Sequence, residues 1–220
     1  MLRKGDFIWI GVLFIFIAVL AFPSSRIVFI DVTEAHPYIG GFFKFAVLAT
    51  MGDLLGARVS SGHYKKPEGF VQRVAVWGFI GVVTTLALSI FPAGVAFAQG
   101  KGMLPLDGNI FFKALFTSMV MNIVLSPVIF MFHKFTDTYI DTKYTIRDNK
   151  ITLKDIVDKI DWFTYVNFSL FKTIPFFWIP CHTIVFLFPA EYRVIASAFA
   201  SIALGLILAL ANSSKVSAVN

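Results

Sequence analysis

Hydrophobic residues in this chain gather in long runs separated by shorter polar segments. A bilayer core is about 30 Å thick, and a helix that crosses it needs roughly 20 apolar residues. Six runs approach or exceed that length: Phe7–Phe22, Ile39–Ala57, Val74–Ala98, Asn109–Phe132, Trp162–Phe188 and Tyr192–Ala211. The pattern predicts an all-α fold, a polytopic transmembrane bundle of about six spans.

The composition supports a membrane protein. Of the 220 residues, 57% are hydrophobic and 15% are charged, whereas soluble domains average roughly 45–50% and 25%. The mean hydropathy is +0.78. The single cysteine, Cys181, excludes an internal disulfide framework.

Basic residues are distributed unevenly between the loops. With the N-terminus inside, 13 of the 19 Lys and Arg fall on the inner side. Four fall on the outer side: Arg26, Lys101, Lys113 and Arg193. The other two, Lys44 and Lys172, lie within spans. The positive-inside rule therefore places both termini in the cytoplasm. The net charge of +6 then reflects basic residues in cytoplasmic loops, and we expect no nucleic-acid partner.

The first span is the weakest of the six. Arg3 and Lys4 precede a short apolar stretch, and Val19-Leu20-Ala21 would suit a signal peptidase. Cleavage and retention both stay open, and we expect a retained signal anchor. The chain then divides into this anchor with its outer loop (1–38), a helical bundle (39–212) and a short polar tail (213–220). The loop charges and the lack of a mitochondrial-type leader favour a bacterial cytoplasmic membrane, with an organelle membrane as the alternative.

The fourth loop, 133–161, is the longest polar segment. Thr152 and Asp155 have the spacing of a capping box. An apolar stripe follows at helical spacing: Leu153, Ile156, Val157 and Ile160. This pattern predicts one cytoplasmic interfacial helix, and its basic loop could contact anionic lipid.

Small residues recur every four positions along the last span, at Ser197, Ser201 and Gly205. Such residues let helix backbones approach closely in lipid. They predict packing within the bundle, with a homo-oligomer face as the alternative.

Ionisable and polar groups inside a bilayer are costly and ask for a reason. Lys44 is close enough to the outer interface to snorkel. Four deeper residues are candidates for a pathway lining or an ion pair: Asp53, Asn122, Lys172 and His182. Of these, we expect Asp53 and Lys172 to contact each other. Pro127, Pro175 and Pro180 remove backbone donors nearby. A broken helix beside a cavity and a packing kink both explain this pattern.

Enzymatic motifs are absent from the sequence. The histidines have no metal-ligand spacing, and no phosphate-binding glycine loop or nucleophile elbow occurs. We therefore expect a protein that is not an enzyme and uses no metal or cofactor.

Several short motifs, in this order, resemble the Mpv-seventeen and peroxisomal membrane protein family of small integral membrane proteins. They cover roughly residues 40–212 and comprise Gly52-Asp53, Arg73 with Gly78, Asn122 with Pro127, and Pro180 followed by Pro189, Tyr192 and Arg193. The chain departs from the family where an Asp-Gln pair reads Met121-Asn122, where the Gly-Pro after Gly78 is missing, and where a closing Trp-Asn is reduced to Asn212. The family is usually described with four spans, so 1–38 looks like an addition.

The resemblance implies a channel-like protein or one that affects metabolite homeostasis. Our leading hypothesis is a channel or carrier for small solutes, with a polar pathway between the helices. The alternative is a non-transporting scaffold or assembly factor, in which the polar residues lock the bundle.

Overall fold

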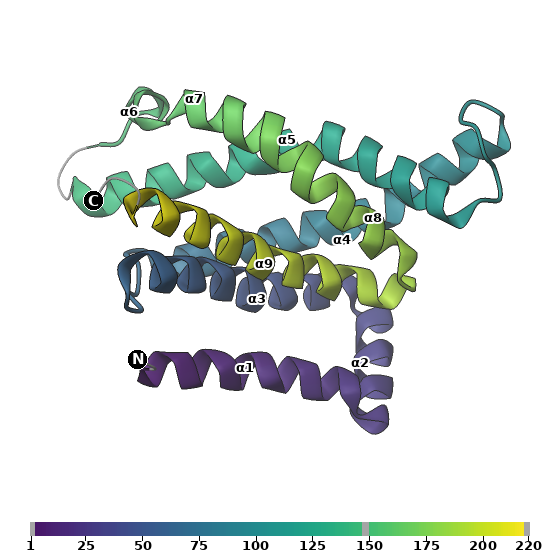
Figure 1. The fold of residues 1–220 in the computed structure, drawn as a ribbon, viewed down its shortest axis with the longest axis horizontal. Coiled ribbons are helices and arrows are strands. Elements are labelled where there is room, and N and C mark those ends of the chain that lie inside the picture. Colours follow the sequence, from purple (N-terminus) through teal and green to yellow (C-terminus); the bar gives the residue numbers. More distant parts are fainter. Residues whose placement is uncertain (1–2, 147–149, 218–220) are drawn as a thin grey trace.

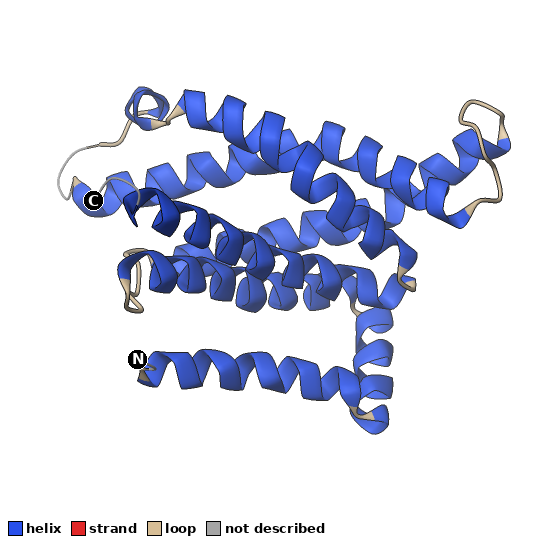
Figure 2. Cartoon of the chain, viewed as in Figure 1, coloured by secondary structure: helices blue, strands red, loops and turns tan. Residues whose placement is uncertain are grey.

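Helices account for nearly all of the computed structural model, which describes residues 3–146 and 150–217, the last ten by backbone alone. Figure 2 shows these helices joined by short loops, with no strand among the described residues. In chain order they are α1 (Lys4–Ala21), α2 (Pro23–Ala35), α3 (Pro37–Ser61), α4 (Phe70–Gly100), α5 (Ile110–Thr145), α6 (Leu153–Lys159), α7 (Trp162–Thr164), η1 (Tyr165–Trp178), α8 (Ile179–Leu187) and α9 (Ala190–Ser217).

Six helical stretches are long and apolar enough to cross a membrane, which confirms the predicted spans. Five are α1, α3, α4, α5 and α9, and the sixth is the continuous stretch from α7 to α8. Figure 1 shows them roughly side by side, with the start of α1, the end of α5, and α6 gathered at one end of the bundle. The chain is an integral membrane protein with an all-α fold.

α3 lies at the centre of the bundle, between α4 and α9 (Figure 1). Its backbone approaches α9 so closely that a Cβ on Gly52 would lie 2.9 Å from the Ser201 carbonyl oxygen. A Cβ on Gly205 would likewise lie 2.7 Å from the Gly52 carbonyl oxygen. The small residues of α9 are therefore used within the chain; a homo-oligomer stays a prediction.

The expected outer loop before residue 38 contains a helix. α2 runs across the end of the bundle rather than along it (Figure 1). It covers Lys44, whose ammonium donates a hydrogen bond to Thr33 Oγ1 at 2.8 Å and lies 4.4 Å from the centre of the Phe29 ring. Lys44 thus reaches toward the predicted outer interface but is buried there, with 7% of its surface exposed.

The fourth span is longer than expected, because α5 continues past Phe132 to Thr145. The segment assigned to the fourth loop, 133–161, therefore begins with a helical continuation of the fourth span. Polar residues end the apolar run, but no Gly or Pro occurs between 133 and 145 to end the helix. Arg73 of α4 also forms ion pairs with Asp137 and Asp141, one turn apart on α5. These contacts hold the extension against the bundle.

The predicted surface helix is present as α6. Thr152 caps it, and Asp155 completes the capping box. Ile160, at the end of the stripe, is 5% exposed, and Lys159 donates a hydrogen bond to Thr142 of α5. α6 therefore packs on the extension of α5, although Leu153 stays exposed. Residues 147–149 of this loop and 218–220 of the predicted tail lie outside the described residues, and α9 extends into that tail through Ser217.

Candidate functional site

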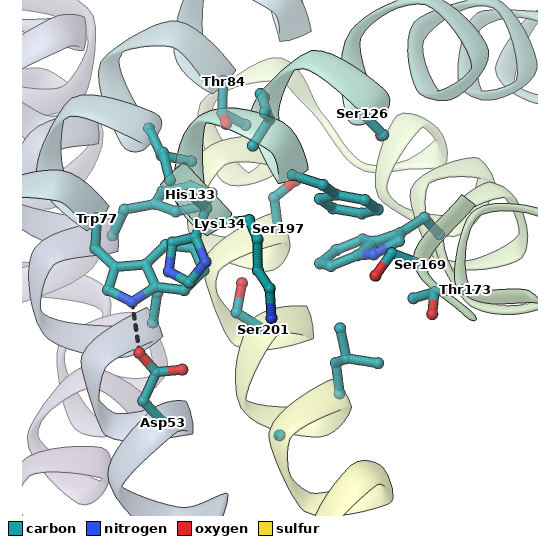
Figure 3. Close-up of a pocket in the computed structure, with 18 of the residues that line it drawn as sticks. Asp53, Trp77, Thr84, Ser126, His133, Lys134, Ser169, Thr173, Ser197 and Ser201 are labelled. Atoms are coloured by element: carbon teal, nitrogen blue, oxygen red, sulfur yellow. Dashed lines mark hydrogen bonds between the residues drawn. The ribbon is translucent and has the colours of Figure 1, made fainter. Parts of the chain in front are cut away.

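A cavity of about 300 Å³ lies inside the bundle. α3, α4 and α5 line one side, and η1, α8 and α9 line the other (Figure 3). Aromatic rings form much of its wall, and polar side chains interrupt that wall from almost every helix. A space of this kind, mostly apolar with a few convergent polar groups, is typical of a small-molecule site.

Charged groups gather at the end of the cavity nearer α6. The Asp53 carboxylate accepts a hydrogen bond from Trp77 Nε1 at 2.7 Å. The His133 ring packs on Trp77, with 4.4 Å between ring centroids. Figure 3 shows Lys134 extending into the cavity between this group and the side that carries Ser169 and Thr173. Its ammonium takes part in no hydrogen bond or ion pair with the described residues.

An ion-pair network lies directly behind this charged end. Arg73 forms an ion pair with Asp137 at 2.9 Å and a second one with Asp141. His133 Nδ1 lies 3.6 Å from the Asp137 carboxylate. The network joins α4 to α5 and fixes the turn of α5 that carries His133 and Lys134.

Asn122 is the centre of a buried network behind the cavity wall. It is fully buried, and its amide nitrogen donates to the Ser118 carbonyl oxygen at 2.8 Å. Its amide oxygen accepts from Ser126 Oγ at 2.9 Å and lies 3.1 Å from His182 Nδ1. The Trp178 ring stacks on His182, with 5.1 Å between centroids.

This network determines which ring nitrogen of neutral His182 carries the proton. A backbone carbonyl can only accept, so the Asn122 nitrogen must face Ser118, and the Asn122 oxygen must face His182. His182 Nδ1 therefore donates, which leaves Nε2 as a hydrogen-bond acceptor. His182, Trp178 and Ser126 all line the cavity.

Two further polar atoms in the cavity wall are buried and unpaired. Neither Ser197 Oγ nor Trp178 Nε1 has a hydrogen-bond partner among the described residues. Buried polar groups are normally paired, and both residues line the cavity, so these two atoms are candidates for contact with a bound molecule.

The structure brings together two of the four predicted site residues at the cavity. Asp53 lines its charged end and His182 its inner wall, while Asn122 lies behind the wall and positions His182. Lys172 lies elsewhere: it is exposed on the outside of η1, and no ion pair joins it to Asp53 in the described chain. The expected Asp53–Lys172 contact is therefore wrong.

The geometry of η1 explains the position of Lys172. η1 is a π-helix, whose hydrogen bonds run from i to i+5 and whose turn is wider than that of an α-helix. Its polar lining residues accordingly recur every four to five positions, and together with Trp178 they are Tyr165, Ser169 and Thr173. Lys172 falls between two of these positions and points away from the cavity.

The motif residues of the family resemblance hold the bundle together. Besides Gly52, Asp53, Arg73 and Asn122, described above, Gly78 leaves room for Phe42, since a Cβ there would lie 2.4 Å from that ring. The Pro127 carbonyl accepts a hydrogen bond from Tyr165, and Arg193 donates to the Phe188 carbonyl. Pro180 opens α8, while Pro189 and Tyr192 form the turn into α9.

Sequence reasoning missed Lys134, His133 and Trp77. Lys134 and His133 had been assigned to a cytoplasmic loop, because the apolar run ends just before them. The available signal was their i−4 and i−3 spacing to Asp137, which is typical of one helix face. Trp77 falls within the apolar run Val74–Ala98, where nothing in the sequence distinguishes it from the other apolar residues.

Outside the spans, hydrogen bonds set the ionisation of two carboxylates. Donation from Thr164 lowers the pKa of Asp161, and the charge of Lys134 contributes at longer range. Donation from Thr152 lowers the pKa of Asp155 in the same way. Within the described residues, no group of three or more His, Cys, Asp or Glu could hold a metal ion.

Comparison with known proteins adds no relative: no family model matches the chain, and neither the curated proteins nor the solved structures contain a match.

Proposed function

We propose that this protein is a channel or carrier for small polar solutes, and that the solute passes through the cavity between α3, α5, η1 and α9. One observation carries the proposal. Polar and charged side chains, including an ammonium without an ion-pair partner among the described residues, point into a space of about 300 Å³ inside a bundle that spans the membrane. Such groups are costly in lipid and typically mark solute or ion pathways.

Other features agree with this function. η1 is irregular where it lines the cavity, and irregular backbone at membrane depth is typical of transporter and channel sites. The resemblance to the Mpv-seventeen and peroxisomal membrane protein family favours a channel-like role. The charge distribution favours a bacterial cytoplasmic membrane, with both termini inside.

Solute flux from proteoliposomes tests the proposal. Purified protein is reconstituted, and the release of neutral, anionic and cationic solutes of graded size is measured. We expect release that is limited by size or charge, and its reduction by at least about tenfold in Lys134→Leu. The matched control is Lys172→Leu, which removes a lysine outside the cavity and should leave release unchanged.

A scaffold without transport activity predicts a different result. Wild-type protein would then release no solute above empty liposomes, and Lys134→Leu would change only thermal stability. Equal losses in both lysine variants would place the pathway outside this cavity.

A further inference from the structure

Two opposite charges line the cavity without neutralising each other. Asp53 is held by Trp77, a neutral donor, and no ion pair joins its carboxylate to the ammonium of Lys134 in the part of the chain that the structure describes. Both side chains nevertheless face the same space (Figure 3). Asp53 is exposed at the open end of this space and Lys134 is half-buried, so a ligand between them could reach both charges.

The inner wall offers a second set of groups, which are neutral. Trp178 Nε1 and Ser197 Oγ are buried without a hydrogen-bond partner among the described residues, and His182 Nε2 is left as an acceptor. All three residues line the cavity beyond the charged end. They suit a ligand that carries an uncharged polar group away from its charges.

The charges decide the class of ligand. A simple anion would pair with Lys134 and leave the Asp53 carboxylate facing a second negative charge. A simple cation would pair with Asp53 and leave the Lys134 ammonium facing a second positive charge. A ligand with one positive and one negative group satisfies both residues, because each charge meets its opposite.

We propose that the cavity binds a small zwitterion of the α-amino-acid type. Its ammonium would pair with Asp53, its carboxylate with Lys134, and a polar side chain would face Ser197, Trp178 and His182. Water occupies roughly 30 Å³ per molecule in the liquid, so a cavity of about 300 Å³ has room for about ten non-hydrogen atoms. This proposal rests on the proposed function in naming the solute, but it concerns binding and is tested separately from flux.

Binding is measured on the full-length protein in lipid nanodiscs by calorimetry, with L-glutamine as the zwitterionic probe. Two analogues serve as controls, and both are smaller than glutamine, so the cavity cannot exclude them by size. Glutaramate lacks the ammonium and is an anion, and 4-aminobutanamide lacks the carboxylate and is a cation. We expect saturable binding of glutamine and at least about tenfold weaker binding of each analogue.

Variants separate charge recognition from loss of structure. Asp53→Asn should abolish the preference for glutamine over glutaramate, and Lys134→Met should abolish the preference for glutamine over 4-aminobutanamide. Lys172→Met is the matched control and should bind like the wild type. A purely structural role for either residue would weaken all three probes in proportion.

Three results would overturn this proposal. Glutaramate binding as tightly as glutamine would indicate an anion site, and equal binding of 4-aminobutanamide would indicate a cation site. No saturable binding of glutamine, serine or valine would show that the cavity does not take this class. Size-limited flux without such binding would leave the proposed function intact, whereas binding without flux would remove the transport function alone.

Discussion

Individual polar residues in this bundle are held by partners that hydropathy does not show. Lys44 is the clearest case, because its ammonium is buried and forms no ion pair within the described part of the chain. It depends on Thr33 and on the Phe29 ring, both from α2. The Lys44 side chain extends toward the interface, as snorkelling predicts. Residues of α2 then provide the contacts of its ammonium.

Thr33→Val tests this dependence at nearly constant volume. The variant removes the acceptor for a buried ammonium, so the free energy of unfolding should fall by about 1–3 kcal/mol. Lys44→Met removes the charge itself, and the double variant Thr33→Val with Lys44→Met should therefore be more stable than Thr33→Val alone. Thermal unfolding in a single detergent measures all three; additive losses would contradict the contact.

Residue chemistry also explains where the prediction of the site failed. Asp53 and His182 could be chosen from sequence, because a polar group in an apolar run is visible without coordinates. Lys134 could not, since it follows the apolar run and looks like an ordinary loop residue. Its role depends on α5 continuing as a helix to Thr145, which a hydropathy pattern does not report.

At the scale of elements, the sequence predicts the spans well but not their local geometry. Long apolar runs determine where helices cross a membrane, so all six predicted spans are present. The π-helical turn of η1 is not encoded in hydropathy, and Lys172 lies on its exposed side, away from the cavity. α2 was missed for a similar reason, because its 13 residues are too short and too polar to be recognised as a span.

The contact between α3 and α9 predicts opposite effects for two glycine substitutions. Gly52→Ala places a methyl group against the backbone of α9 and should destabilise the protein by about 1–3 kcal/mol. Gly94→Ala on α4 meets nothing within 4 Å and should be neutral or stabilising by up to about 1 kcal/mol. Thermal unfolding compares the two; an equal loss would mean that helix propensity, rather than close approach, sets the effect.

α6 should be sensitive to acid through its cap. Hydrogen bonds from Thr152 lower the pKa of Asp155 below its ordinary value of 3.8. The cap therefore contributes its full stability above pH 3.8, and this contribution is lost as the pH falls through the lower pKa of the folded state. Amide exchange of residues 153–159, corrected for intrinsic rates, should accelerate in this range in the wild type.

Asp155→Asn is the control for that measurement. Its amide cannot titrate, so the additional acceleration in acid should disappear while exchange at neutral pH becomes faster. The same acid dependence in the variant would assign the effect to another group, such as Asp161, whose pKa is lowered by Thr164.

At the scale of the whole molecule, the bundle combines a tightly packed centre with an open polar space. α3 packs closely against α4 and α9 at glycine residues, whereas α5, η1 and α8 line the cavity on its other sides. The Asn122 network and the Arg73 ion pairs hold the two parts together. Lys134, whose ammonium has no ion-pair partner among the described residues, extends into this space.

The central claim is that solute passes through this cavity, and cysteine modification tests it most directly. Cys181→Ala removes the only native thiol, and Ser201→Cys then places one in the cavity wall. Phe171→Cys is the matched control on the outer surface of η1, where the native side chain is 69% exposed.

Flux from proteoliposomes is measured before and after treatment with a small charged thiol reagent, and labelling is quantified by mass spectrometry. We expect modification of Ser201→Cys to reduce flux by at least about tenfold, because the adduct occupies the pathway, and modification of Phe171→Cys to leave flux unchanged. Full labelling of Ser201→Cys with undiminished flux would contradict the account.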